Sequence, residues 1–293
     1  MVWLTSESPQ ARLLAGKDEI VFAPHAAQRD VRNVLLTLPA AMRALLHYRP
    51  TVVVSTGAAI ALAVLPAARI CGVEAHYIES AARTDGPSLT GRLLRRLPGA
   101  HCYTQWEPWA TRGWSYAGSV FDGFATEPAP GAKSVRRVVV TLGTQQSYGF
   151  TRLIRKLLDI VPAGAEVFWQ VRAADAAELG IAASPFVPTE ELIEEIRQAD
   201  VVVAHAGIGS ALTALQLGKC PVLVPREQMY NEHVDDHQGL IRLQMEGAGL
   251  AVVRTVEDLT FADLEKAAKC TVKITNAPPL KLQGRLGKSF SRL

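Results

Sequence analysis

The chain has 293 residues, of which 48% are hydrophobic and 20% charged, a composition that is typical of folded globular proteins and excludes a disordered one. Its formal net charge of +3 comes without a basic stripe interleaved with aromatic residues, so we expect no nucleic-acid partner. The cysteines are widely spaced and fit no metal or redox motif, which favours a reducing cytosol: Cys71, Cys102, Cys220 and Cys270.

Short β-branched segments alternate with longer helical patterns along the whole chain. The strands predicted in the first half are Val2–Thr5, Ile20–Ala23, Val52–Ser55, Ala75–Glu79 and His101–Thr104. Those predicted in the second half are Arg137–Thr141, Val167–Val171, Val201–His205, Pro221–Val224 and Leu250–Val253. Several are apolar on both faces, as parallel strands between two layers of helices are. The alternation predicts an α/β protein of two Rossmann-like, doubly wound domains.

Three segments indicate how the chain is divided into buried parts, a linker and a tail. The uncharged stretch TVVVSTGAAIALAVLPAA, residues 51–68, is broken by polar residues, Gly57 and Pro66, so it predicts a buried strand, turn and helix rather than a membrane span. The segment DGFATEPAPGAKSVRR, from Asp122, lacks periodicity and predicts a linker between domains over residues 1–124 and 135–293. From Lys273 on, five basic and no acidic residues predict a loosely held tail.

The start of the chain is unusual for a doubly wound domain. The strand VWLTS is followed by ESPQARLLAG, which is not glycine-rich. We therefore expect that the first domain is abbreviated or lacks its first strand and loop. The first residues, MVWLTSESPQ, also lack the basic start and apolar core of a signal peptide, which favours a cytoplasmic location.

The strongest motif is DVVVAHAGIGSALTALQLGKCPVLVPRE, residues 200–227. A buried strand ends at His205, and Gly207 and Gly209 allow a tight turn. Ser210 is suited to cap a helix over Ala211–Leu217, where the unpaired N–H groups and the positive end of the helix dipole would attract an anion. Because the spacing lacks the full dinucleotide fingerprint, NAD binding is poorly supported. An ordinary turn without a ligand is the alternative.

The next segment, EQMYNEHVDDHQGL, gathers Glu232, His233, Asp235 and Gln238 after the following strand. Its residue types allow a metal site, a polar cradle for sugar hydroxyls, or a solvated helix N-terminus. We favour the cradle, because ligands of open α/β sheets bind at the carboxyl ends of the strands.

Three other segments carry candidate functional residues. Gly143 and Thr144 come after the strand in VVVTLGTQQSYGF and would line a cleft, unless they form an ordinary turn. Glu79 ends the strand in AHYIES, where a carboxylate serves either as a general base or as an acceptor for a neighbouring loop. The segment SLTGRLLRRLPG predicts a short amphipathic helix that rests on an anionic membrane surface or exposes a solvated basic face.

Together these segments resemble glycosyltransferase family 28. The stretch HAGIGSALTALQLGKCPVLVPREQMYNEHVDDHQ resembles the catalytic subunit of the two-subunit N-acetylglucosaminyltransferase of dolichol-linked oligosaccharide assembly and its bacterial exopolysaccharide counterparts. The stretch VSTGAAIALAVLPAARICGVEAHYIESAARTDGPSLTGRLL, with QWEPW and YAGSVFD, resembles the anchoring partner subunit. The resemblance covers residues 2–253 and implies that an acceptor half and a donor half are fused in one chain.

The resemblance implies a GT-B fold, with two Rossmann-like domains facing a cleft. It implies an inverting hexosyltransferase that needs no metal or cofactor and moves a sugar from a UDP-sugar to a saccharide on polyprenyl pyrophosphate, at the cytoplasmic face of the membrane. Glu79 and His205 become the catalytic candidates. The donor-binding candidates are Gly143, Thr144, His205, Gly207, Gly209, Ser210, Arg226, Glu232, His233, Asp235 and Gln238.

Two departures from the family leave alternatives open. Relatives begin with a strand and a Gly-Gly-His loop whose histidine is the favoured base, so this chain is expected to start late or to be inactive alone. Thr213 stands where plant-type relatives carry a ribose-binding glutamate. The alternatives are a nucleotide-sugar 2-epimerase and a non-catalytic UDP-sugar-binding subunit that needs a partner.

Overall fold

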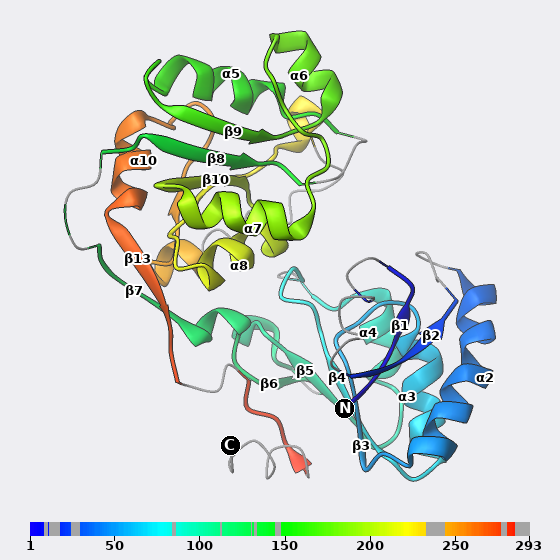
Figure 1. Ribbon diagram of the computed structural model, residues 1–293. Coiled ribbons are helices and arrows are strands. Elements are labelled where there is room, and N and C mark those ends of the chain that lie inside the picture. The colour runs from blue at the N-terminus through cyan, green and yellow to red at the C-terminus, as the bar shows by residue number, and fades with distance from the viewer. Residues whose placement is uncertain are drawn as a thin grey trace. The chain divides into compact units, whose positions relative to one another are not determined.

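The structure is a computed structural model in which the chain forms two compact units (Figure 1). Unit 1 contains Met1–Val120 together with the C-terminal segment that starts at Pro278, and unit 2 contains Phe121–Ala277. The residues that the structure describes are 1–8, 11, 18–24, 30–83, 86–111, 113–129, 131, 134–143, 148–232, 244–276 and 280–284.

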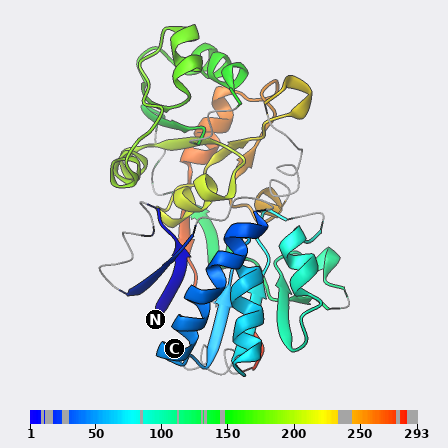
Figure 2. The same ribbon diagram turned by 90° about the vertical axis from the view of Figure 1, so that its right-hand side faces the viewer.

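Unit 1 contains two parallel sheets. The strands β1 (Val2–Ser6) and β2 (Glu19–Ala23) pair with each other. The second sheet has the order β3-β4-β5-β6, and its strands are Val52–Ser55, Glu74–Ile78, Ala100–Thr104 and Ser115–Tyr116. The helices are α2 (Val31–Tyr48), α3 (Ala61–Ile70) and α4 (Leu89–Leu94), and Figures 1 and 2 show α2 and α3 lying side by side.

Unit 2 contains a five-stranded parallel sheet with the order β12-β11-β10-β8-β9. In chain order these strands are β8 (Arg137–Thr141), β9 (Glu166–Gln170), β10 (Val201–His205), β11 (Val222–Val224) and β12 (Val252–Val253). The helices are α5 (Thr151–Ile160), α6 (Ala173–Leu179), α7 (Thr189–Gln198), α8 (Ile208–Gln216) and α10 (Phe261–Ala268).

The core of unit 2 shows why its strands are apolar on both faces. Side chains alternate between the two faces of a strand. Val138 and Val140 of β8 therefore share a cluster with side chains of α5 and α10, whereas Val139 shares one with Ile196 of α7 and Ala214 of α8. The two helical layers confirm the doubly wound arrangement expected for this half.

All ten predicted strands are present in the structure, with ends shifted by at most two residues. Three further strands were missed. The expected linker from Asp122 is wrong in its first part, because Phe124–Pro128 forms strand β7 and pairs antiparallel with β13 (Cys270–Ile274). Each strand is too short to be recognised alone, and their partnership spans well over a hundred residues of sequence. The short strand β6 was the third.

The expected loose tail also differs from what the described residues show. Lys273 lies in β13, and residues 280–284 return to unit 1. The Lys281 N–H donates to the Ala117 carbonyl at 2.6 Å, and Leu280 and Leu282 pack on Tyr103 and its neighbours. Apolar side chains at alternate positions in LKLQG, residues 280–284, therefore hold a segment that its charge alone would leave in solvent.

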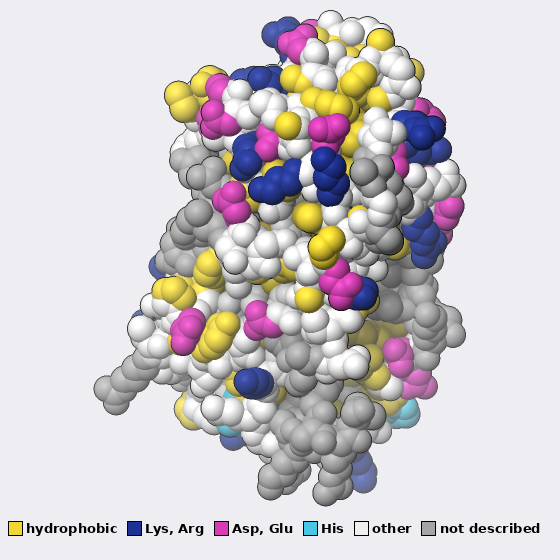
Figure 3. Space-filling model, turned by 90° about the vertical axis from the view of Figure 1, so that its left-hand side faces the viewer, with side chains coloured by type: hydrophobic (Ala, Val, Ile, Leu, Met, Phe, Trp, Pro, Cys, Tyr) yellow, Lys and Arg dark blue, Asp and Glu magenta, His cyan; other side chains and the backbone are white. Residues whose placement is uncertain are grey.

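The distribution of charged side chains on the surface agrees with the small net charge of the chain. On the face shown in Figure 3, basic and acidic side chains are interspersed, without a continuous basic stripe among the coloured residues. Among the helices of the described residues, none has both the length and the apolar character needed to cross a lipid bilayer.

Candidate functional site

The candidate site lies where β8, β10 and β11 of unit 2 end. The parallel register places Ala204 beside Thr141 and His205 beside Val224, so the loops that follow these strands leave the sheet at one edge. Carboxyl ends of parallel strands are the usual ligand position in open α/β sheets. The structure thus brings the glycine turn to the same edge as Gly143, which follows β8, and Arg226, which follows β11.

The imidazole of His205 is enclosed by two glycines. A Cβ atom at Gly207 would lie 2.3 Å from His205 Nε2, and one at Gly143 would lie 2.9 Å from His205 Cε1. Gly143 also has φ of +76°, a backbone conformation that side chains disfavour. Both glycines are therefore required by the position of this one ring, which the sequence did not reveal.

The helix after the turn begins earlier than predicted. Helix α8 starts at Ile208 with Gly207 as its N-cap, so the prediction that Ser210 caps the helix is wrong. Gly209 and Ser210 instead occupy the first turn of the helix. Ala211 makes the first intrahelical bond, to the Gly207 carbonyl at 3.1 Å. The N–H groups of residues 208–210 precede that bond.

Gly209 is the open point of this turn. It is exposed, and a Cβ atom added there would meet nothing within 4 Å. The space beside the first turn of α8 is therefore accessible, and the positive end of the helix dipole would stabilise an anion there.

Arg226, which follows β11, joins the neighbouring loops. It is 4% exposed, and its Nη2 donates to the Leu142 carbonyl at 2.9 Å. Its Nη1 lies 3.5 Å from the Tyr148 carbonyl, and the guanidinium lies over the Phe150 ring. Burial lowers the pKa of Arg226. These contacts indicate that Arg226 shapes the edge of the site by holding the loop after β8.

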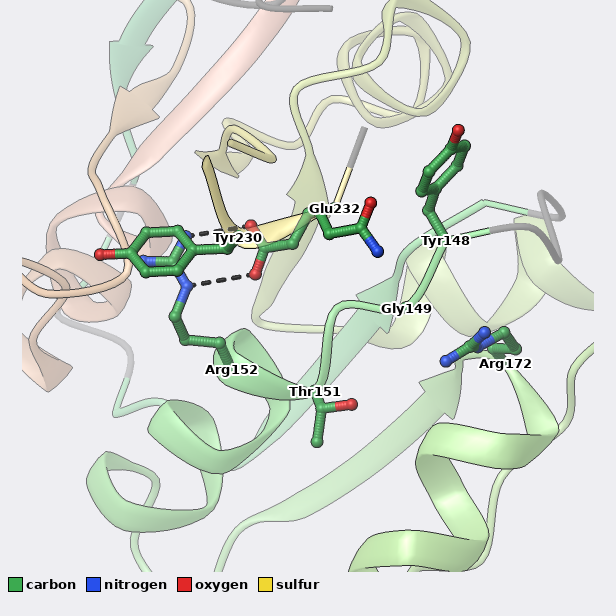
Figure 4. Close-up of a pocket in the computed structure, with 8 residues that line it drawn as sticks. Tyr148, Gly149, Thr151, Arg152, Arg172, Tyr230 and Glu232 are labelled. Carbon is green, nitrogen blue, oxygen red and sulfur yellow. Dashed lines mark hydrogen bonds and ion pairs between the residues drawn. The ribbon is translucent and has the colours of Figure 1, made fainter. Parts of the chain in front are cut away.

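Glu232 forms an ion pair that the sequence did not predict. Its two carboxylate oxygens accept hydrogen bonds from Arg152 Nε at 3.1 Å and Nη2 at 3.0 Å, as the dashed lines in Figure 4 show. Burial alone would lower the pKa of Arg152, but hydrogen bonds to Glu232 and Glu257 outweigh it and raise that pKa. The Arg152 guanidinium also lies 3.8 Å from the centre of the Tyr230 ring.

This ion pair forms one wall of a pocket of about 400 Å³. Figure 4 shows Tyr148 and Arg172 on its other side. The pocket is lined by Tyr148, Gly149, Thr151, Arg152, Arg172, Tyr230, Asn231 and Glu232. Its volume is within the range of small-molecule sites, and its charged lining suits a polar ligand.

Asp175 fixes the entrance to α5 beside this pocket. It is 2% exposed and accepts hydrogen bonds from Arg172 Nη2 at 2.6 Å, from the Phe150 N–H at 3.2 Å and from the Thr151 hydroxyl at 3.1 Å. Burial alone would raise the pKa of Asp175, but these hydrogen bonds outweigh it and lower that pKa. A Cβ atom at Gly149 would lie 2.4 Å from Arg172 Nη2, which explains the glycine.

Glu79 lies in unit 1, at the end of β4, and its carboxylate is fully engaged. It accepts hydrogen bonds from the N–H and hydroxyl of Ser88, both at 2.9 Å, and from the Ser80 N–H and Tyr77 hydroxyl, both at 3.1 Å. Burial raises the pKa of Tyr77, so its hydroxyl keeps the proton that it donates. With Glu79 only 2% exposed, these contacts favour the loop-holding alternative, and its role as a base stays a prediction.

The remaining predicted site residues cannot be placed. Thr144, His233, Asp235 and Gln238 lie outside the described residues. The residues that sequence reasoning missed are Arg152, Arg172 and Asp175, with the two pocket tyrosines. They stand in no recognisable motif, and their ion-pair partners are revealed by the fold alone. The glycine in SYGFTR was the one local sign of a close approach.

Comparison with known proteins matches this unit to a family. Residues 137–276 fit the model of the glycosyltransferase family 28 C-terminal domain. The chain is 42% identical over 48 residues, 16% of its length, to the UDP-N-acetylglucosamine transferase subunit ALG13 of Yarrowia lipolytica, of which it spans 24%.

Two other matches extend over more of the chain. It is 29% identical over 250 residues, 78% of its length, to the UDP-N-acetylglucosamine–N-acetylmuramyl-(pentapeptide) pyrophosphoryl-undecaprenol N-acetylglucosamine transferase of Xylella fastidiosa, and it spans 65% of that protein. The crystal structure of Acinetobacter baumannii MurG superposes with a TM-score of 0.55 at 18% identity, covering 90% of this chain and 80% of that one. At this identity the likeness shows the fold, which is GT-B as predicted.

Proposed function

Since residues 137–276 form a glycosyltransferase family 28 C-terminal domain, we propose that this chain is an inverting, metal-independent glycosyltransferase. It transfers a sugar from a UDP-sugar to a saccharide carried on polyprenyl pyrophosphate, in the assembly of an exopolysaccharide or a related glycan. The name of the Xylella fastidiosa relative describes transfer of N-acetylglucosamine to a pyrophosphoryl-undecaprenol acceptor, which supports this class of substrates.

The observation that carries the proposal is the open helix start at Gly209. In the reaction, the oxygen of an acceptor hydroxyl bonds to the anomeric carbon of the sugar, and the bond from that carbon to the diphosphate breaks. Negative charge then develops on the leaving diphosphate. The accessible start of α8, with Ser210 in its first turn, supports the assignment of this helix start to the stabilisation of that charge without a cation.

The other groups of this edge position the donor. His205, enclosed by Gly143 and Gly207, presents its ring at the base of the turn. The pocket with Arg152 and Glu232 supplies polar contacts for the sugar nucleotide. His233, Asp235 and Gln238, which lie outside the described residues, remain sequence-based candidates for contacts with its hydroxyl groups. Glu79 and His205 are this chain's candidates for moving the acceptor proton.

The proposed lipid-linked acceptor suggests that the protein acts at the cytoplasmic face of a membrane. Helix α4 exposes Leu89 and Leu93, which are 58% and 44% exposed, next to the exposed Arg92 and Arg96. Apolar side chains flanked by arginines suit the interface of an anionic bilayer. We therefore propose peripheral attachment through this helix.

The donor site is tested by calorimetric titration with UDP. Gly209→Leu fills the open space at the helix start and should abolish detectable binding. The same change should raise the free energy of unfolding by about 0.5–1 kcal/mol, because glycine is a poor helix former. Gly164→Leu is the matched control, since Gly164 also has open space around it but precedes β9 at the far end of the sheet. Equal UDP affinity in both variants would disprove this donor site.

Turnover assays distinguish the alternatives. Transfer from a UDP-sugar to a lipid-linked saccharide should persist in excess chelator. Interconversion of a UDP-sugar without an acceptor would instead identify a 2-epimerase. UDP binding with turnover only after a partner is added would identify a binding subunit.

A further inference from the structure

A cluster of three side chains in unit 1 has the composition of a metal site. Glu74 begins β4 and His76 follows two residues later, so both side chains lie on one face of the strand. His101 of β5 is the register partner of His76 and joins them on that face. Their ligand atoms all lie within 4.8 Å of one another.

The distances fit a small cation. Glu74 Oε1 lies 3.0 Å from His76 Nε2 and 3.9 Å from His101 Nε2. The two imidazole rings are stacked, with centres 4.8 Å apart and planes inclined by 20°. Ligands of a tetrahedral zinc ion stand about 2.0–2.2 Å from the metal and hence roughly 3.3 Å from one another. Small side-chain adjustments would bring these three groups to that spacing.

A second group orients the buried histidine. His76 is fully buried, and its Nδ1 lies 3.0 Å from the Tyr103 hydroxyl. That hydroxyl accepts a hydrogen bond from the Gln283 N–H at 2.9 Å. A histidine whose second nitrogen donates to a fixed oxygen presents its first nitrogen to a metal. The imidazole of His101 is 36% exposed and leaves solvent a path to a fourth ligand position.

We propose that Glu74, His76 and His101 bind one divalent ion of the zinc type, with water as the fourth ligand. The site lies near the beginning of β4 and β5, at the opposite end of these strands from Glu79, so the ion takes no part in the proposed transfer reaction. It joins two strands next to the point where residues 283–284 return to unit 1. A Cβ atom at Gly284 would lie 1.8 Å from Glu74 Oε1, so the returning segment covers the carboxylate.

The competing account is a hydrogen-bonded network without metal. In that network the Tyr103 hydroxyl donates to His76 Nδ1, and His76 Nε2–H donates to Glu74. It satisfies those groups but leaves His101 outside the network, because 3.9 Å is too long for a hydrogen bond to Glu74 and its imidazole is 36% exposed to solvent. Metal binding uses all three side chains.

The first test is titration of chelator-treated protein with Zn²⁺ by calorimetry and with Co²⁺ by visible absorption. The wild type should bind one equivalent that both His101→Asn and Glu74→Gln lose, together with the tetrahedral Co²⁺ bands. His47→Asn is the control, since His47 is exposed on α2. Any other histidine or cysteine that binds metal would contribute equally to all four proteins. An unchanged stoichiometry in His101→Asn, or no binding by the wild type, would overturn the proposal.

A second test separates a ligand from a merely structural residue. Zn²⁺ should raise the melting temperature of the wild type and of His47→Asn but not that of His101→Asn. Tyr103→Phe should weaken Zn²⁺ binding by about 10–100-fold, as loss of an orienting group does. UDP affinity should be the same in all of these proteins, so failure here is distinct from failure of the donor site. Equal stabilisation of wild type and His101→Asn by Zn²⁺ would contradict the site.

Discussion

The loop after β4 in unit 1 and the loop after β10 in unit 2 both follow a parallel strand, but their side chains differ: the first loop is ordered around a buried carboxylate, and the second contains glycine. After β4, Glu79 is buried, and its carboxylate is surrounded by hydrogen-bond donors from Tyr77, Ser80 and Ser88. After β10, Gly207 and Gly209 carry no side chain, and Gly209 faces open space.

This difference shows two roles for the carboxyl end of a parallel strand: it can order the loop that follows, or it can leave room for a ligand. A charged side chain that accepts several hydrogen bonds orders the following loop and closes the backbone to ligands. Gly209 leaves open space beside the first turn of α8, whereas Gly207 makes room for the His205 ring. A closed loop should therefore lose stability when it is changed, whereas an open one should lose binding.

Glu79→Gln is expected to have the largest effect on stability. One carboxylate oxygen becomes an amide NH₂, which cannot accept a hydrogen bond, so at least one buried donor of Ser80, Ser88 or Tyr77 loses its acceptor. The free energy of unfolding should fall by about 3 kcal/mol, and UDP affinity should not change. Urea denaturation and calorimetry measure both quantities.

The exposed Glu107→Gln serves as the control and should leave both quantities unchanged. If Glu79→Gln kept its stability but lost turnover, Glu79 would act as a base and the comparison between the loops would fail.

Gly207→Ala is expected to have an intermediate effect on stability and a clear one on binding. The backbone φ of −83° allows alanine, but its Cβ would collide with His205 and force the ring away. We expect a loss of about 2 kcal/mol from overpacking and a poorer N-cap, together with weaker UDP binding.

Adding His205→Ala in the same chain should restore part of the stability lost in Gly207→Ala, because it removes the collision. Strict additivity of the two changes, measured in urea, would show that the ring and the glycine are independent.

Asp175→Asn should have the smallest effect, about 1.5 kcal/mol at neutral pH, because its ion-pair partner Arg172 is 30% exposed and water can replace the lost contact. The folded-state pKa of Asp175 is lowered, so the ionised carboxylate contributes stability above its ordinary value of 3.8 and loses it as the pH falls through the folded value. The difference between wild type and variant should therefore shrink below pH 3.8. Urea denaturation at several pH values measures this, with the exposed Asp159→Asn as control. A constant difference would mean that the charge of Asp175 is not involved.

Much of the fold was predictable because buried parallel strands have a strong local signal. Runs such as Val201–Val203 are apolar at every position, which few other elements require. The strands β7 and β13 were not predictable, because each gains its stability from a partner that is distant in sequence. The start of α8 was misplaced at Ser210, since glycine is also an acceptable N-cap and the sequence offered both residue types within four positions.

The sequence by itself determined the α/β class, the order of the strands along the chain and the segments that follow them, since these depend on local periodicity and on glycine. The tertiary structure alone decided which side chains meet. It paired Arg152 with Glu232, enclosed His205 between Gly143 and Gly207, and stacked His76 on His101. Ion pairs, close approaches and ligand sets depend on strand register and on loops that converge at one edge, and spacing along the chain does not encode those distances.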